Sequence, residues 1–138
     1  MPGRFGSWRE FEAQAKAARL ASVVCLTPRD EIEELAPDYA AAMQRGDVPY
    51  EWVHLPIPNF GVPPNGETFR DAIARLARRI ESGDAVLMHC AAGMGRTGSA
   101  ACCVLKALGM PASEALARVR EAGSNPQNAA QSGFVDWF

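Results

Sequence analysis

The sequence predicts an α/β fold in which a small, mainly parallel central sheet is flanked by helices. Three short apolar runs, at residues 21–26, 50–57 and 85–89, are typical of buried strands, and segments with helical periodicity separate them. Parallel strands need long crossover connections, which helices usually supply, so this alternation favours a parallel sheet. We expect the third strand to be central, with the loop after it at the carboxyl edge of the sheet, where such folds bind ligands. A length of 138 residues suits one domain, which we expect to span residues 1–138.

The first half of the chain is expected to contain three helices. Ser7 and Glu10 have the spacing of a capping box, which predicts a helix that runs to about Arg19. After the first strand, residues 30–35 predict a short acidic helix. Residues 37–44 predict a further helix, which begins at a proline, a residue well suited to a first helical turn.

The second half is expected to contain one strand and four helices. Residues 56–64 predict a proline-rich loop, which Asn65 and Gly66 close. A long amphipathic helix follows and ends near Gly83; its apolar face consists of Phe69, Ile73, Leu76 and Ile80. The remaining helices are expected after the third strand, at residues 96–108, 113–121 and 126–138.

Composition and charge narrow the classes of partner. Hydrophobic residues make up 48% of the chain and charged residues 22%, as in ordinary soluble proteins. The net charge of −2 gives no general attraction to nucleic acid or to anionic membranes, so we expect neither as a partner. No apolar run reaches the length of a transmembrane helix, and residues 1–5 are unlike a signal peptide. The four cysteines have neither metal-ligand nor disulfide-scaffold spacing, so we expect a reducing, cytoplasmic location and no metal or other cofactor. The oligomeric state stays open.

The most informative stretch is residues 86–98, where an apolar run leads into a cysteine, a glycine-containing loop and an arginine. Gly93 and Gly95 let the backbone curl so that successive N–H groups point inward and form an anion nest. The helix that follows adds the partial positive charge and free N–H groups of its N-terminus. Arg96 supplies a planar fork that grips two oxygens of one phosphate. Cys90, at the base of this positive loop, is expected to have a lowered pKa and to act as a thiolate nucleophile.

The motif His-Cys-x-x-Gly-x-x-Arg-Thr-Gly at residues 89–98 resembles the signature of the cysteine-dependent protein tyrosine phosphatases, dual-specificity enzymes included. The resemblance covers nearly the whole chain and is greatest to small dual-specificity phosphatases. It implies that Cys90 forms a phosphocysteine intermediate and that Thr97 hydrogen-bonds its sulfur. The phosphate-binding residues that it implies are Ala91, Ala92, Gly93, Met94, Gly95 and Arg96. No segment resembles the phosphotyrosine-recognition loop of the larger tyrosine-specific domain.

In such phosphatases an aspartate on a separate loop protonates the leaving oxygen, in a context like Leu-x-Ile-Pro-Asp-Phe. The chain has Leu-Pro-Ile-Pro-Asn-Phe at residues 55–60, so Asn59 stands at the acid position, and an amide cannot deliver a proton. Three interpretations stay open. Asn59 is an engineered replacement of a native aspartate, or it is natural and the acid comes from elsewhere, or the protein is a slow or inactive phosphate binder. The candidate acids elsewhere are Asp30, Glu31 and Glu33.

Four further residues have roles that the sequence leaves less defined. Gln131 is similar to a C-terminal glutamine of the family that positions water for the second chemical step, or it is an ordinary surface glutamine. His89 is expected to point away from the pocket as a structural hydrogen-bonding residue, and His54 to be an ordinary strand residue. Cys25 is expected to be a buried core thiol; the alternative is a protective disulfide with Cys90 under oxidation.

Together with the resemblance, these residues predict a protein phosphatase that hydrolyses phosphotyrosine, with phosphoserine and phosphothreonine as further candidates. Neither Ala91 nor Met94 is basic, which argues against a highly charged lipid headgroup and for a phosphorylated protein or a small phosphate ester. The alternatives are a non-catalytic, phosphoprotein-binding pseudophosphatase and a rhodanese-like sulfurtransferase, which also uses a cysteine in an anion-binding loop.

Overall fold

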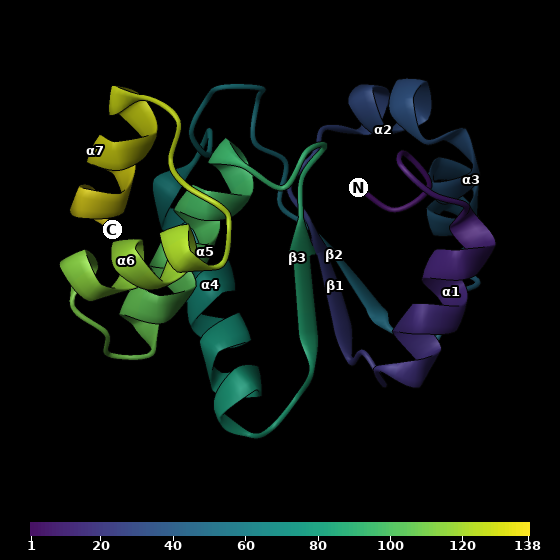
Figure 1. Ribbon diagram of the computed structural model, residues 1–138, viewed down its shortest axis with the longest axis horizontal. Helices are drawn as coiled ribbons and strands as arrows, with labels where there is room; N and C mark the ends of the chain where they lie inside the picture. The colour runs from purple at the N-terminus through teal and green to yellow at the C-terminus, as the bar shows by residue number, and fades with distance from the viewer.

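A three-stranded parallel sheet lies at the centre of the computed structural model, which describes all residues from 1 to 138 (Figure 1). The strands are β1 (Ser22–Cys25), β2 (Glu51–His54) and β3 (Val86–His89). Val24 of β1 lies opposite Val53 of β2 and Met88 of β3. Both connections between strands contain helices, as parallel pairing requires. The predicted α/β fold is therefore confirmed.

The order of the strands, β2-β1-β3, corrects one expectation. β1 is the central strand, and β3 lies at an edge of the sheet. The physical reason is that residues 8–17, before β1, form a helix with the Ser7 and Glu10 side chains in a complete capping box, so this segment does not pair with the outer side of β3. The loop after β3 still lies at the carboxyl end of the sheet, where it was expected.

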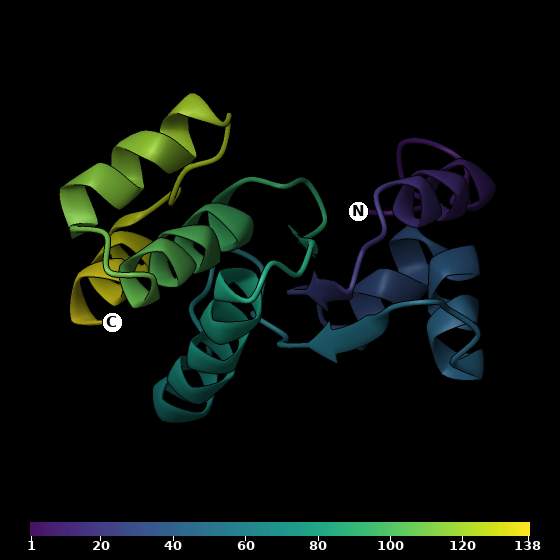
Figure 2. The same cartoon turned by 90° about the horizontal axis from the view of Figure 1, so that it is seen from below.

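Two groups of helices cover the two faces of the sheet (Figures 1 and 2). On one side lie α1 (Trp8–Ala17), α2 (Arg29–Leu35) and α3 (Pro37–Arg45). On the other side lie α4 (Gly66–Glu81), α5 (Gly95–Ala107), α6 (Ala112–Glu121) and α7 (Ala129–Trp137). No helix of the structure is long and apolar enough to cross a membrane.

Each face of the sheet has its own hydrophobic core. Val24 and Leu26 pack with Phe69 and Ile73 of α4 and with α5 in the larger cluster. On the opposite face, Cys25 packs with Ile32, Ala36, Tyr39 and Ala40 in a smaller cluster. Successive strand residues point to opposite faces, so β1, which is fully buried, contributes to both cores.

The predicted elements are present, with small shifts at their ends. The second strand ends at His54 rather than near residue 57, although Leu55 and Ile57 still donate N–H hydrogen bonds to the carbonyls of Cys25 and Leu26. The last helix begins three residues later than expected because Asn128 caps it by accepting a hydrogen bond from the Gln131 N–H.

Candidate active site

The loop at residues 90–96 joins the end of β3 to the start of α5, at the carboxyl edge of the sheet (Figure 1). Gly93 has a φ of +76°, a left-handed conformation that glycine adopts without steric cost. The loop therefore wraps around the N-terminus of α5, where free N–H groups and the helix dipole favour an anion.

Cys90 lies at the base of this loop and is 3% exposed. Burial alone raises the pKa of its thiol, but the polar hydrogens of the Thr97 hydroxyl and of the Thr97, Ala92 and Gly93 N–H groups outweigh this effect, so the pKa is lowered from 9.0. The Thr97 hydroxyl is buried and has no hydrogen-bond partner, so it is free to donate to the sulfur. The environment therefore favours the thiolate, the nucleophilic form of a cysteine.

Arg96 forms a bidentate ion pair with Glu31 of α2. Its two terminal nitrogens donate to the two carboxylate oxygens at 2.8 and 2.7 Å, and one of them also donates to the Ile57 carbonyl at 3.3 Å. The Glu31 hydrogen bonds raise the pKa of this guanidinium, which is 5% exposed. A bidentate pair of this kind fixes the orientation of the fork as well as its charge.

A small pocket of about 40 Å³ opens above the sulfur and brings several predicted site residues together. Cys90 and Arg96 line it with Asn59 of the loop after β2 and with Gln131 of α7. Its other lining residues are Phe60, Ala92, Met94, Gly95 and Gln127. No aspartate or glutamate is among them, and Asn59, at the position where an acid was expected, lines the same pocket as Cys90.

The three alternative acids lie elsewhere. Glu31 pairs with Arg96, and Asp30 and Glu33 are exposed on α2 and do not line the pocket. Glu33 accepts a hydrogen bond from Gln44 instead. None of the three carboxylates therefore lines the pocket that contains Cys90.

The start of α7 fastens the Asn59 loop to the phosphate loop. Gln131 is 1% exposed, so its interpretation as a surface residue is wrong. Its amide nitrogen donates to the Gly61 carbonyl at 3.2 Å, and its amide oxygen accepts from the Gln127 N–H at 2.8 Å. Asn128 adds a hydrogen bond to the Phe60 carbonyl. These contacts set the position of the loop over the pocket.

Two site residues, Ser124 and Gln127, were not found from the sequence. The Ser124 hydroxyl donates to the carbonyls of Gly93 and Met94 at 2.8 and 3.0 Å. The Gln127 side chain accepts a hydrogen bond from the Gly95 N–H at 3.2 Å. Both lie about thirty residues from their partners in the chain, and a polar residue in a loop gives no local signal of such a contact.

His89 and His54 have the structural roles that were expected. His89 is buried and points away from the pocket; its Nε2 lies 2.8 Å from the Tyr39 hydroxyl, which in turn accepts the Trp52 indole N–H. Burial lowers the pKa of His89 to about 4. His54 contacts the Thr27 carbonyl.

Cys25 is a buried, free thiol, as expected. Burial raises its pKa. It packs in the smaller core against Ile32 and Tyr39, on a different face of the sheet from the core that includes Cys90. This packing agrees with a core residue rather than a disulfide partner.

Comparisons with known proteins agree with this geometry. A family model described as "Swiss Army Knife protein, DSP-PTPase phosphatase domain" matches residues 7–133. A Cupriavidus necator protein, provisionally named a tyrosine-protein phosphatase, is 43% identical over 61 residues, which are 44% of this chain and 22% of that protein. This chain therefore matches about a fifth of that relative's length.

Solved structures give the same fold. A kinase-associated phosphatase, with its catalytic-site cysteine replaced by serine, superposes with a TM-score of 0.81 at 18% identity over 98% of this chain and 80% of that one. The active form of Tk-PTP superposes with a TM-score of 0.70 at 28% identity over 97% of this chain and 86% of that one. Since the family model spans most of the sequence and the fold is shared, this chain belongs to the DSP-PTPase family of phosphatase domains.

Proposed function

We propose that this chain is a cysteine-dependent protein phosphatase that hydrolyses phosphotyrosine through a phosphocysteine intermediate on Cys90. The observation that supports it most directly is the thiol of Cys90, whose pKa is lowered by hydrogen bonds, in one small pocket with the Arg96 fork. A thiolate beside a fixed cation and a ring of N–H groups has the charge pattern that a phosphoryl group needs during transfer.

The first step is attack of the Cys90 sulfur on phosphorus, in line with the leaving oxygen. A sulfur–phosphorus bond forms, and the phosphorus–oxygen bond breaks with its electron pair on the leaving oxygen. The N–H groups of residues 91–96 and Arg96 hold the other three oxygens while charge shifts between them. Glu31 acts as a positioning residue in this step, because it fixes the plane of the guanidinium.

In the second step, water attacks phosphorus and the Cys90 thiolate leaves. The buried Thr97 hydroxyl, which has no hydrogen-bond partner in the structure, would stabilise that thiolate by donating a hydrogen bond to it. Gln131 lines the pocket, and its amide nitrogen has a second hydrogen besides the one donated to Gly61, which supports a role in placing the attacking water. The Gly95 N–H donates to the Gln127 side chain, so that side chain has to move for this donor to reach phosphate.

Asn59 cannot supply the proton that the proposed mechanism requires for the leaving group. We propose that position 59 is where the general acid belongs and that the chain with Asn59 is impaired. The absence of any carboxylate among the pocket residues supports this. Without an acid, turnover is expected to be best for leaving groups that are stable as anions, such as aryl oxygens.

The substrate class follows from the rim of the pocket. Phe60 is 63% exposed and Met94 is 38% exposed, and both line the pocket. Their apolar surfaces favour the phenyl ring of phosphotyrosine over a highly charged headgroup. No basic side chain other than Arg96 lines the pocket.

The alternative is a pseudophosphatase that binds phosphoproteins without turning them over. The lack of a carboxylate in the pocket also favours this pseudophosphatase, since the anion-binding loop and Arg96 are intact while the proton donor is absent. The two functions differ in whether a phosphorylated ligand is released unchanged.

Steady-state hydrolysis distinguishes the phosphatase from the pseudophosphatase. The substrates are p-nitrophenyl phosphate, phenyl phosphate and a phosphotyrosine peptide, and the proteins are the unaltered chain, Asn59→Asp and Cys90→Ser. We expect Asn59→Asp to raise kcat about 10²- to 10⁴-fold for the poorer leaving groups and less for p-nitrophenol, because a positioned acid contributes most where the leaving anion is unstable. Cys90→Ser is expected to abolish turnover. If neither cysteine-containing form turns over while the peptide still binds, the pseudophosphatase function is correct instead.

A further inference from the structure

The Ser124 hydroxyl contacts the phosphate loop from outside the pocket. It donates to the Gly93 carbonyl at 2.8 Å and to the Met94 carbonyl at 3.0 Å, and its single hydrogen is shared between the two oxygens. Ser124 itself does not line the pocket above Cys90. One hydroxyl therefore holds two successive peptide groups of the loop, the one before and the one after the Met94 Cα atom.

Holding these two carbonyls also sets the direction of two N–H groups. Every peptide bond in the chain is trans, and in a planar trans peptide the carbonyl and the N–H point to opposite sides. The Gly93 carbonyl shares its peptide group with the Met94 N–H, and the Met94 carbonyl shares its group with the Gly95 N–H. Both N–H groups consequently point away from Ser124. For Gly95 this direction leads to the pocket, since its N–H donates to the side chain of Gln127, a pocket residue.

No regular secondary structure fixes this part of the loop. Met94 has a φ of −103° and a ψ of −113°, which are the angles of neither a helix nor a strand. Its carbonyl also accepts the Gly98 N–H at 2.6 Å. The peptide group before Met94 has less support, because Ser124 is the only donor to its carbonyl and its N–H donates no hydrogen bond within the chain. The orientation of that peptide group therefore depends on Ser124, and its N–H is available to an anion.

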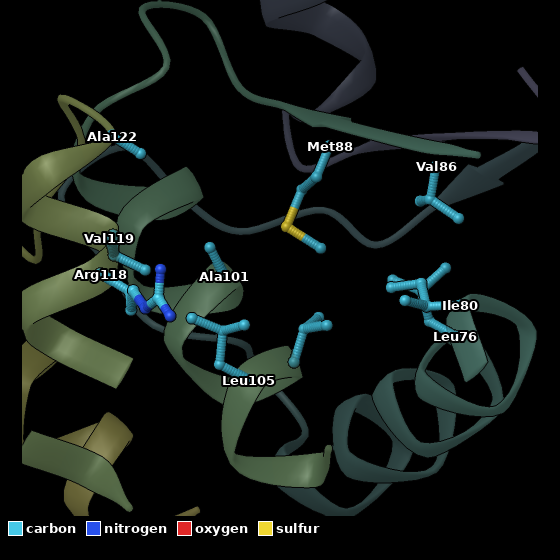
Figure 3. Close-up of a pocket in the computed structure, with 10 residues that line it drawn as sticks. Leu76, Ile80, Val86, Met88, Ala101, Leu105, Arg118, Val119 and Ala122 are labelled. Atoms are coloured by element: carbon cyan, nitrogen blue, oxygen red, sulfur yellow. The ribbon is translucent and has the colours of Figure 1, made fainter. Parts of the chain in front are cut away.

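The end of α6 holds Ser124 in a fixed place. Gly123 has a φ of +86°, and its N–H donates to the Arg120 carbonyl. The Ser124 N–H donates to the Val119 carbonyl. These are the two hydrogen bonds of a Schellman motif, a common end of a helix with a left-handed glycine. Val119 faces Ala101 of α5 across an apolar cavity of about 300 Å³ (Figure 3), so the motif ties Ser124 to a helix that packs on α5.

We propose that Ser124 is a positioning residue for phosphate, whose hydroxyl turns the N–H groups of Met94 and Gly95 toward the oxygens of a bound phosphoryl group. This inference rests on the phosphate-binding role proposed for the loop and deepens it. Donors that already point at the anion bind it without the free-energy cost of reorganising the backbone. Without the hydroxyl, the peptide group before Met94 loses the only partner of its carbonyl, so its N–H is no longer held toward phosphate.

Amide NMR with stepwise addition of inorganic phosphate tests this role without requiring turnover. In the parent, phosphate should shift the amide signals of Met94 and Gly95, and the dependence on concentration gives the Kd. Ser124→Ala is expected to raise that Kd about 3- to 10-fold, which corresponds to the usual net contribution of one hydrogen bond. Ser124→Thr keeps the hydroxyl and should bind phosphate as tightly as the parent.

A matched control and a stability measurement separate positioning from a purely structural role. Ser113→Ala removes an exposed hydroxyl from the first turn of α6 and should leave the Kd for phosphate unchanged. Urea unfolding checks that each variant is folded under the conditions of the titration. An unchanged Kd in Ser124→Ala would overturn the inference, whether or not that variant is less stable. Weak binding by Ser124→Thr, or a parent whose Met94 and Gly95 signals do not respond to phosphate, would overturn it as well.

The same titration distinguishes this inference from the activity proposed for Cys90. In a Cys90→Ser background, Ser124→Ala should weaken phosphate binding by a similar factor, because the orientation of the N–H groups needs no nucleophile. Loss of the Ser124 effect in that background would contradict the inference. A parent that binds phosphate but does not hydrolyse p-nitrophenyl phosphate would contradict the phosphatase, while weaker binding by Ser124→Ala would still support the positioning role.

Discussion

The Glu31 carboxylate determines how the Arg96 guanidinium faces the pocket. Both of its oxygens accept from that side chain, and it is the only acid that does so. The cation is nearly buried, so no solvent molecule can replace this partner at low cost. The orientation of the phosphate-binding fork thus depends on a residue 65 positions earlier in the chain.

We predict that Glu31→Gln lowers kcat/KM for p-nitrophenyl phosphate by about 10- to 100-fold, because a misplaced binding group of this kind costs roughly that much. The change should also weaken inhibition by inorganic phosphate, since the ground-state anion uses the same fork. Glu34→Gln, an exposed acid on the same helix, is the control and should retain the parent's kcat/KM. Equal kinetics in the two variants would refute the positioning role of Glu31.

At the scale of the elements, the contact between α5 and the segment at residues 124–128 holds the site together. Gly98, one turn into α5, packs directly on this segment: a Cβ at that position would lie 2.5 Å from the backbone of Asn125. The glycine of the Arg-Thr-Gly motif is therefore required by close approach of two backbones. The same segment supplies Ser124 and Gln127 to the phosphate loop.

Gly98→Ala is expected to destabilise the protein by about 1–3 kcal/mol, since backbone atoms have to move to admit the methyl group. Gly133→Ala, in the middle of α7 with no atom near the added Cβ, should instead stabilise by roughly 0.5–1 kcal/mol. Urea unfolding of the parent and both variants measures the change in the free energy of unfolding that each substitution causes. A Gly98→Ala protein as stable as the parent would show that the two segments separate easily.

Local sequence patterns were sufficient to predict the helices and strands, but such patterns carry no information about tertiary contacts. The helix at Ser7 and the strand before Cys90 follow from capping and periodicity, which act within a few residues. Strand order depends on which distant segments pair, so β3 was wrongly expected to be central. For the same reason, Cys90 and Arg96 were found as one motif, whereas the pairing of Glu31 with Arg96 was not.

Across the whole molecule, a chain of hydrogen bonds links the strand of the nucleophile to the helices on the other face. The Trp52 indole N–H donates to the Tyr39 hydroxyl, which contacts Nε2 of His89. Nδ1 of that histidine lies 3.3 Å from the Cys90 carbonyl. The neutral histidine with hydrogen on Nδ1 fits all of these contacts, since Nε2 then accepts from Tyr39.

This network predicts a pH dependence of stability. Burial lowers the pKa of His89 to about 4 in the folded state, below its ordinary value of 6.5. Between these values the unfolded chain binds the extra proton, so stability contributed by the neutral histidine is present above pH 6.5 and falls as the pH drops toward 4. The loss amounts to about 3 kcal/mol.

Urea unfolding at several pH values, compared with His89→Gln, isolates this contribution because the carboxylates are common to both proteins. The difference in unfolding free energy between the parent and His89→Gln should shrink as the pH falls. Parallel stability curves would contradict a neutral, buried His89.

The four thiols of the chain differ in pKa, so their reactivity can report how much of the protein is folded. Burial raises the pKa of Cys25, Cys102 and Cys103, and the loop hydrogen bonds lower that of Cys90. A slow alkylating reagent at neutral pH should therefore consume one equivalent per native chain and four per unfolded chain. The stoichiometry of labelling thus reports the folded fraction of any preparation, and the single labelled sulfur in the native fraction counts its intact phosphate-binding loops.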